Sequence, residues 1–176
     1  MRNSIKCGLI ALVLSISCIG HAAENPIEKA DLTPEQIQRA KAFKQVLGID
    51  KGYRSGAYVY TKRSIDDYMK EPEKLAARLA VLGFTDVYLG SEKALSGEAD
   101  DYMKWQRTFI REAHKYGLKV HALRLSSAKL YVSDMKILED CNSVINYNYS
   151  VKKSDRFDGI SADLEPHILK KGFIDY

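Results

Sequence analysis

Two stretches of the chain, 82–87 (LGFTDV) and 116–120 (YGLKV), share one order of residue types and decide the fold. In each, a helical pattern stops at a glycine, after which an apolar and a polar residue lead into a β-forming run. The glycines, Gly83 and Gly117, are 34 residues apart, which is the length of one strand-plus-helix unit. The repeat therefore predicts βα units, which build a parallel sheet with helices packed on it.

Further segments of both kinds extend this pattern in both directions. Runs of β-forming residues predict strands at 56–61, 86–89, 119–125 and 158–164. Apolar residues at helical spacing predict helices at 33–48, 72–83, 98–117 and 134–149. The polar residues 24–32 are expected to form no regular element.

Two architectures use repeated βα units: an open doubly wound sheet and a (β/α)8 barrel. No glycine-rich phosphate loop follows the first strand, where residues 60–63 read YTKR, and this disfavours the nucleotide-binding open sheet. A complete barrel needs ~250 residues, whereas the fourth strand ends near residue 164 of 176. The predicted fold is therefore α/β, the first four βα units of a (β/α)8 TIM-type barrel, truncated; the alternative is a small open parallel α/β sheet.

The predicted organisation has three parts: a signal peptide at 1–22, an N-terminal segment at 23–55 with a helix that caps the barrel bottom, and the partial barrel at 56–176. Four parallel strands leave both sheet edges with unpaired backbone groups, so self-association through these edges is expected. The inner faces of the strands would carry Tyr58, Tyr60, Tyr88 and Leu123.

The first 22 residues have the pattern of a secretory signal peptide. Arg2 and Lys6 precede an uncharged, mostly apolar run at 7–20, and small residues at 20 and 22 favour cleavage before Ala23. The run is short for a membrane span, although a retained anchor and lipidation at Cys18 are the alternatives. We expect a secreted or periplasmic protein with no membrane span after processing. Cys141 is then the only cysteine, which excludes an internal disulfide, and we interpret it as a helix packing residue.

Charge and composition exclude several classes of protein. The chain is 45% apolar and 28% charged, as expected of a folding globular protein. Its net charge is +4, but acidic and basic residues are interspersed along the whole chain. Nucleic acid is therefore not an expected partner.

The end of the fourth predicted strand carries the candidate chemistry. Because side chains alternate across a strand, Ser161, Asp163 and Glu165 share one face. Two carboxylates that point into a barrel at this end are costly to desolvate unless they have a role, and active sites of barrels lie at this end. Pro166 holds Glu165 extended.

Neighbouring inward carboxylates repel each other, so one can keep its proton while the other stays charged. Cleavage of a glycosidic bond needs this combination, with an acid for the leaving oxygen and a negative charge near the oxocarbenium-like centre. The structural alternative is that Asp163 caps the following helix or pairs with Arg124 on the third strand.

The stretch 157–167 (FDGISADLEPH) resembles the strand-4 signature of glycoside-hydrolase-like TIM barrels, which reads D-G-x-D-x-D-x-E in the family-18 chitinase type. Asp158, Gly159, Asp163 and Glu165 match this motif, and Ser161 stands in place of its first interior Asp. The resemblance implies that Glu165 is the general acid and that Asp163 supports the N-acetyl group of the substrate. The Glu-Pro pair is also similar to the large retaining clan, whose acid/base is an Asn-Glu-Pro glutamate.

Four further residues are candidate substrate contacts: Tyr60, Arg124, His167 and Asp158. His167 with Asp163 is not a recognised metal-ligand spacing, so no metal or cofactor is expected. The sequence therefore predicts an exported glycoside-hydrolase-like protein with a carbohydrate substrate, which need not be active as a truncated chain. The alternatives are a non-catalytic carbohydrate-binding or structural protein and an open α/β hydrolase that acts on another polymer.

Overall fold

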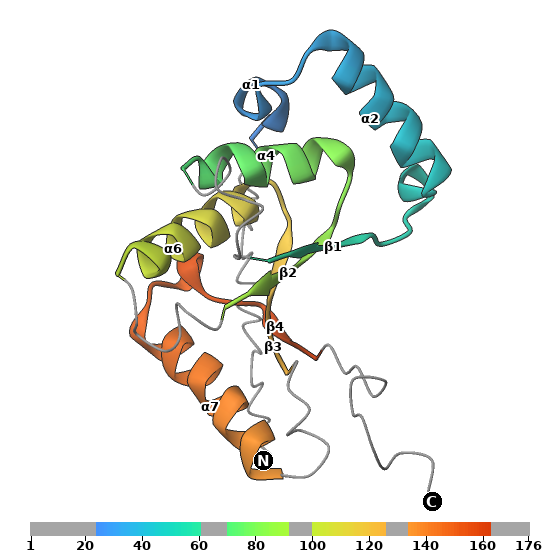
Figure 1. Cartoon of the computed structure of the whole chain (residues 1–176). Helices are drawn as coiled ribbons and strands as arrows, with labels where there is room; N and C mark the ends of the chain where they lie inside the picture. Colours follow the sequence, from blue (N-terminus) through green and yellow to red (C-terminus); the bar gives the residue numbers. More distant parts are fainter. Residues whose placement is uncertain (1–23, 61–69, 92–99, 126–133, 163–176) are drawn as a thin grey trace, which may run out of the picture.

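The computed structural model describes residues 24–60, 70–91, 100–125 and 134–162, and the statements below concern these ranges. They contain one sheet of four strands, β1 (Gly56–Val59), β2 (Asp86–Gly90), β3 (Lys119–Leu125) and β4 (Gly159–Ala162). All neighbouring pairs are parallel, and the strand order is β1-β2-β3-β4 (Figure 1). The prediction of an α/β fold with a parallel sheet is thus confirmed. It agrees with the alternative of an open sheet, and the described residues show no closed barrel.

Three helices lie between successive strands: α4 (Pro72–Leu82), α6 (Asp100–Lys115) and α7 (Asp134–Ser150). Each connection advances by one strand in the same direction, and right-handed connections of this kind place their helices on one face of the sheet. The core confirms this placement. Its sheet members Val59, Val87, Leu89, Val120 and Ala122 pack in one cluster with apolar residues of α4, α6 and α7.

The pattern that the two quoted stretches share is a helix C-cap. Gly83 and Gly117 have φ of 88° and 75°, in the left-handed region that favours glycine. The next residue, Phe84 or Leu118, returns a backbone hydrogen bond to Leu79 or Ala113 at 3.1 Å in both cases. This is the Schellman motif, in which the apolar residue after the glycine covers the helix end. In both places the motif turns the chain directly from the end of the helix, α4 or α6, into the next strand, β2 or β3.

Two more helices precede the sheet, α1 (Pro26–Ala30) and α2 (Pro34–Val46), with 3-10 turns at Ile49–Lys51 and Lys153–Asp155. The prediction of no regular element at 24–32 was wrong. The side chain of Asn25 caps α1, and Ala30 is fully buried near α4, where Arg78 donates to its carbonyl oxygen at 2.8 Å. The predicted start of α2 is confirmed: Thr33 and Gln36 form a reciprocal capping box.

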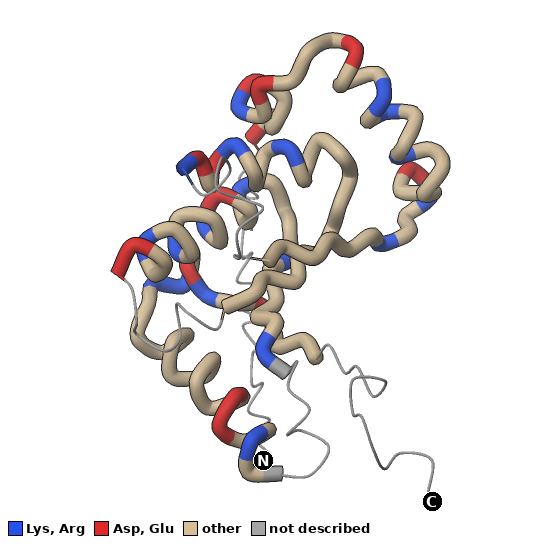
Figure 2. The backbone as a smooth tube through the Cα atoms, viewed as in Figure 1, with Lys and Arg blue, Asp and Glu red and all other residues tan. Residues whose placement is uncertain are grey.

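None of the helices in the described ranges has both the length and the apolar character needed to cross a membrane. Charged residues occur along the helices, whereas the tube along the strands is mostly uncharged (Figure 2). No described helix packs against the second face of the sheet, which we call the helix-free face.

Candidate functional site

Aromatic side chains gather on the helix-free face. The strand register places Tyr58, Tyr88, His121 and Gly159 side by side across the four strands. Neighbouring ring centres lie 5.0 Å apart between Tyr58 and Tyr88 and 5.5 Å apart between Tyr88 and His121. Tyr60 extends the row along β1, with its ring 6.1 Å from that of Tyr58 and nearly parallel to it. We call these four rings the aromatic row.

The aromatic row is accessible, since Tyr58 and Tyr60 are each about half exposed. The sequence prediction that Tyr58, Tyr60 and Tyr88 share one face of the strands is confirmed by their ring contacts. His121 was not predicted as a member. Its position on the same side of β3 could have been found from the strand alternation.

Two glycines make room for the rings. A Cβ atom at Gly56 would lie 2.6 Å from the ring of Tyr88, and a Cβ atom at Gly159 would lie 2.9 Å from Nδ1 of His121. Both distances are shorter than van der Waals contact. The glycines of β1 and β4 therefore allow the rings of neighbouring strands to lie over their backbone.

We expect Gly159→Ala to displace the His121 ring and to lower the free energy of unfolding by about 1–3 kcal/mol, the usual cost of an added atom in a filled space. Thermal or denaturant unfolding measures this loss. In a His121→Ala background the same substitution is expected to cost much less, because the clashing ring is absent. Equal losses in the two backgrounds would contradict the contact.

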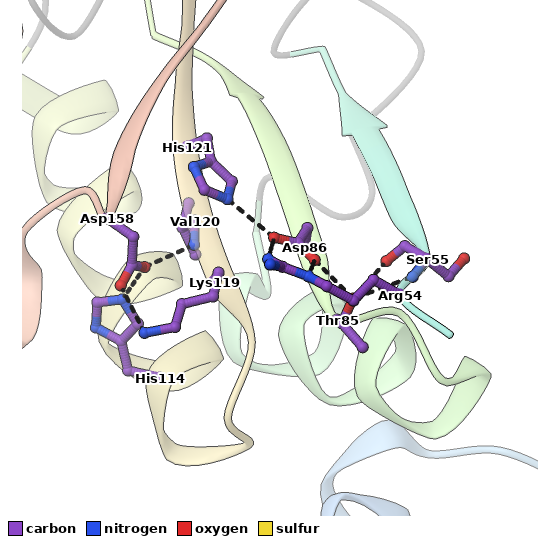
Figure 3. Close-up of polar contacts among 9 residues, drawn as sticks. All are labelled: Arg54, Ser55, Thr85, Asp86, His114, Lys119, Val120, His121 and Asp158. Carbon is purple, nitrogen blue, oxygen red and sulfur yellow. Dashed lines mark hydrogen bonds and ion pairs between the residues drawn. The ribbon is translucent and has the colours of Figure 1, made fainter. Parts of the chain in front are cut away.

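A carboxylate lies beside the aromatic row at the amino end of β2. Asp86 is 4% exposed, and Arg54 and His121 both approach it from neighbouring segments (Figure 3). Arg54 Nε donates to Oδ2 at 3.0 Å and Arg54 Nη2 donates to Oδ1. His121 Nε2 lies 3.0 Å from Oδ1, and the Thr85 hydroxyl donates to Oδ2 at 2.6 Å.

These contacts keep Asp86 ionised. Burial by itself would raise the pKa of Asp86, but the hydrogen bonds from Arg54, Thr85 and His121 outweigh it and lower that pKa from 3.8 to about 2. Each carboxylate oxygen has two partners, so its capacity to accept is filled by the protein itself.

A pocket of about 370 Å³ opens over this carboxylate. Its lining comes from all four strands and the segment before β1: Arg54, Ser55, Gly56, Asp86, Tyr88, His121, Ile160 and Ser161. The pocket therefore adjoins the aromatic row through Tyr88 and His121. The two features form one continuous surface, and we take them together as the candidate site.

A second polar cluster surrounds Asp158, just before β4 (Figure 3). Its Oδ2 accepts from the backbone N–H of Val120 at 2.8 Å and lies 2.9 Å from His114 Nε2, while Lys119 donates to Oδ1 at 3.2 Å. Burial favours a higher pKa, but these hydrogen bonds prevail and lower the pKa of Asp158 below its usual value. The contacts tie the start of β4 to β3 and α6.

The structure separates the residues that the sequence singled out. Tyr60 lies in the aromatic row, whereas Asp158 lies at the amino end of β4 in the cluster just described. Arg124 donates to Asp140 of α7 at 2.9 Å, with only 14% of its side chain exposed, so it points toward the helices. Asp163, Glu165 and His167 lie outside the described residues. Arg124 pairs with Asp140, and the alternative pairing of Arg124 with Asp163 also falls outside the described residues.

Sequence reasoning did not identify Arg54 or Asp86 as site residues. Arg54 precedes the first strand, and Asp86 was assigned only to the strand backbone.

Within the described ranges, no group of three or more His, Cys, Asp or Glu side chains is arranged to hold a metal ion. Comparison of the chain with protein-family models, with curated proteins and with solved structures finds no match.

Proposed function

We propose that the protein binds carbohydrate on the helix-free face and hydrolyses glycosidic bonds, with Glu165 as the general acid. In this proposal β1 to β4 are the first half of a (β/α)8-type barrel, the helix-free face is its lumen, and the protein is exported. The observation that carries the proposal is the aromatic row, which offers flat rings, two of them half-exposed, on the helix-free face.

The order of the strands supports the half-barrel. A doubly wound sheet reverses its strand order and so covers both faces with helices. Here the order advances without reversal and the described helices cover one face, as in a barrel wall. Further strands, from a second copy or another chain, would pair with the free edges of β1 and β4.

The chemistry of sugars supports the use of the aromatic row. One face of a pyranose ring carries C–H groups with slight positive charge, which pack against the negative face of an aromatic ring. Tyr58 and Tyr60, with planes 11° apart, present such faces together. The hydroxyl group of Tyr58 would add hydrogen bonds to sugar hydroxyls at the edge of the same surface.

The catalytic part of the proposal depends on the sequence 163–165 (DLE), which directly follows β4. Continuing the alternation of β4 from Ser161, which lines the candidate site, predicts the same side for Asp163 and Glu165. A non-catalytic carbohydrate-binding protein is the second candidate, because the aromatic row needs neither carboxylate.

Binding of oligosaccharides to the purified chain tests the proposal. The titrations use neutral oligomers of N-acetylglucosamine, glucose and galactose, and acidic oligomers of galacturonate, followed by calorimetry. We expect Tyr58→Ala to weaken sugar binding about fivefold, on the scale of one lost aromatic contact of about 1 kcal/mol. Tyr149→Ala is the control, since Tyr149 is 82% exposed on α7 and away from the sheet. Absence of binding to every sugar, or equal affinities of the wild type and Tyr58→Ala, would refute the carbohydrate function.

A further inference from the structure

The charged group of the pocket that is free to meet a ligand is a hydrogen-bond donor. Asp86 is its acid, and all four of its acceptor positions are filled. Arg54 uses Nε and one Nη2 hydrogen on Asp86, and its side chain is 70% exposed, which leaves its other N–H groups available.

Two more groups add to this set. His121 donates from Nε2 to the carboxylate of Asp86, so Nδ1 of the neutral imidazole is an acceptor, and within the described chain Nδ1 has no hydrogen-bond partner. The hydroxyl of Ser161 lines the same pocket and likewise has no partner among the described residues. Arg54, His121 and Ser161 thus converge on one space from the segment before β1, from β3 and from β4. A ligand that fills this space must supply acceptor atoms for Arg54 and Ser161 and a donor for His121 Nδ1.

The charge of the pocket selects among acceptors. The charge of Arg54 is balanced by that of Asp86, so the pocket does not concentrate the positive charge that a phosphate dianion requires. A carboxylate has one negative charge and two oxygen atoms, which match the remaining N–H groups of a guanidinium and a neighbouring donor. Tyr88, which borders both the pocket and the aromatic row, would hold the ring to which such a carboxylate is attached.

We propose that the pocket recognises the carboxylate of an acidic sugar, a uronate, through Arg54 and Ser161, while a sugar hydroxyl donates to His121 Nδ1 and the sugar ring packs on Tyr88 and Tyr58. This inference rests on the proposed carbohydrate function and specifies its substrate class. It assigns to Asp86 a positioning role: the carboxylate holds Arg54 and His121 in place and does not contact the ligand.

The test compares three ligands on the full chain by calorimetry: a galacturonate oligomer, the neutral galactose oligomer of the same length, and acetate. The uronate oligomer is expected to bind at least tenfold more tightly than the neutral one. Arg54→Gln is expected to abolish this preference, and Ser161→Ala to reduce it about threefold. Ser161 makes no side-chain bond to the described protein, so its variant reports on the pocket even where Arg54→Gln fails to fold.

Arg39→Gln is the matched control, because Arg39 is an exposed arginine of α2 that pairs with Glu35 on the same helix. Equal binding of acidic and neutral oligomers, each weakened by Tyr58→Ala, would overturn the uronate inference and leave the carbohydrate function standing. Binding of acetate as tight as that of the uronate, with no neutral sugar bound and no effect of Tyr58→Ala, would overturn both. Unchanged preference in Arg54→Gln and Ser161→Ala would overturn the assignment of the pocket.

Discussion

Replacing Glu165 by Gln is expected to slow glycoside cleavage at least about 100-fold, a loss of ~3 kcal/mol of transition-state stabilisation. Gln has the same shape but cannot deliver a proton to the leaving oxygen. The rate is measured as kcat/KM on the best-bound oligosaccharide, with folding checked by circular dichroism. Substrate affinity should change little, because the loss concerns the transition state.

Two variants make the result specific to Glu165. Asp163→Asn should also lower the rate, with less change in the acid limb of the pH profile, because the proposed proton donor is retained. Glu139→Gln removes an exposed glutamate of α7 and should leave the rate unchanged. A folded Glu165→Gln variant with undiminished hydrolysis would remove the catalytic assignment and favour the purely carbohydrate-binding alternative.

Asp86→Ala is expected to lower the free energy of unfolding by about 2–3 kcal/mol. The substitution removes the charged hydrogen-bond partner of His121 and Thr85 at a buried position. Breaking such a cluster costs more free energy than the intact cluster contributes to stability, because the remaining polar groups lose their partner. This loss of stability is small for a buried ion pair, because 70% of the Arg54 side chain is exposed and water can replace Asp86 as its partner. Urea unfolding with a fixed m-value measures the change.

Glu35→Ala is the control, since it breaks an exposed pair with Arg39 and should cost less than about 0.5 kcal/mol. Acid unfolding gives a second readout. With a pKa of about 2 in the folded protein and 3.8 otherwise, ionised Asp86 stabilises the fold above pH 3.8 and loses this effect as the pH falls toward 2. Asp86→Asn should lack that part of the acid dependence. If the wild type exceeded Asp86→Asn in free energy of unfolding by the same amount at pH 2 as at neutral pH, the role of the carboxylate charge would be contradicted.

The sequence by itself determined the parallel α/β fold. Gly83 and Gly117 end helices in left-handed conformations, and the apolar residue after each glycine closes the helix end. These are local effects within a few residues of the chain, so they can be read without tertiary information. The alternation along β1 and β2 is local in the same sense, and it predicted the common side of Tyr58, Tyr60 and Tyr88.

Only the tertiary structure decided which polar groups meet. Arg54 and His121 lie 32 and 35 residues from Asp86 in the chain. They contact it because the strand register pairs Asp86 with Gly56 and Lys119, each of which is two residues from one of these partners. In the same way, Arg124 pairs with Asp140 because α7 packs on that side of β3. Such pairs depend on register and on helix placement, which arise from the packing of the whole core. Periodicity in the sequence shows the face on which a side chain lies, and only the assembled core shows which residue it contacts on that face.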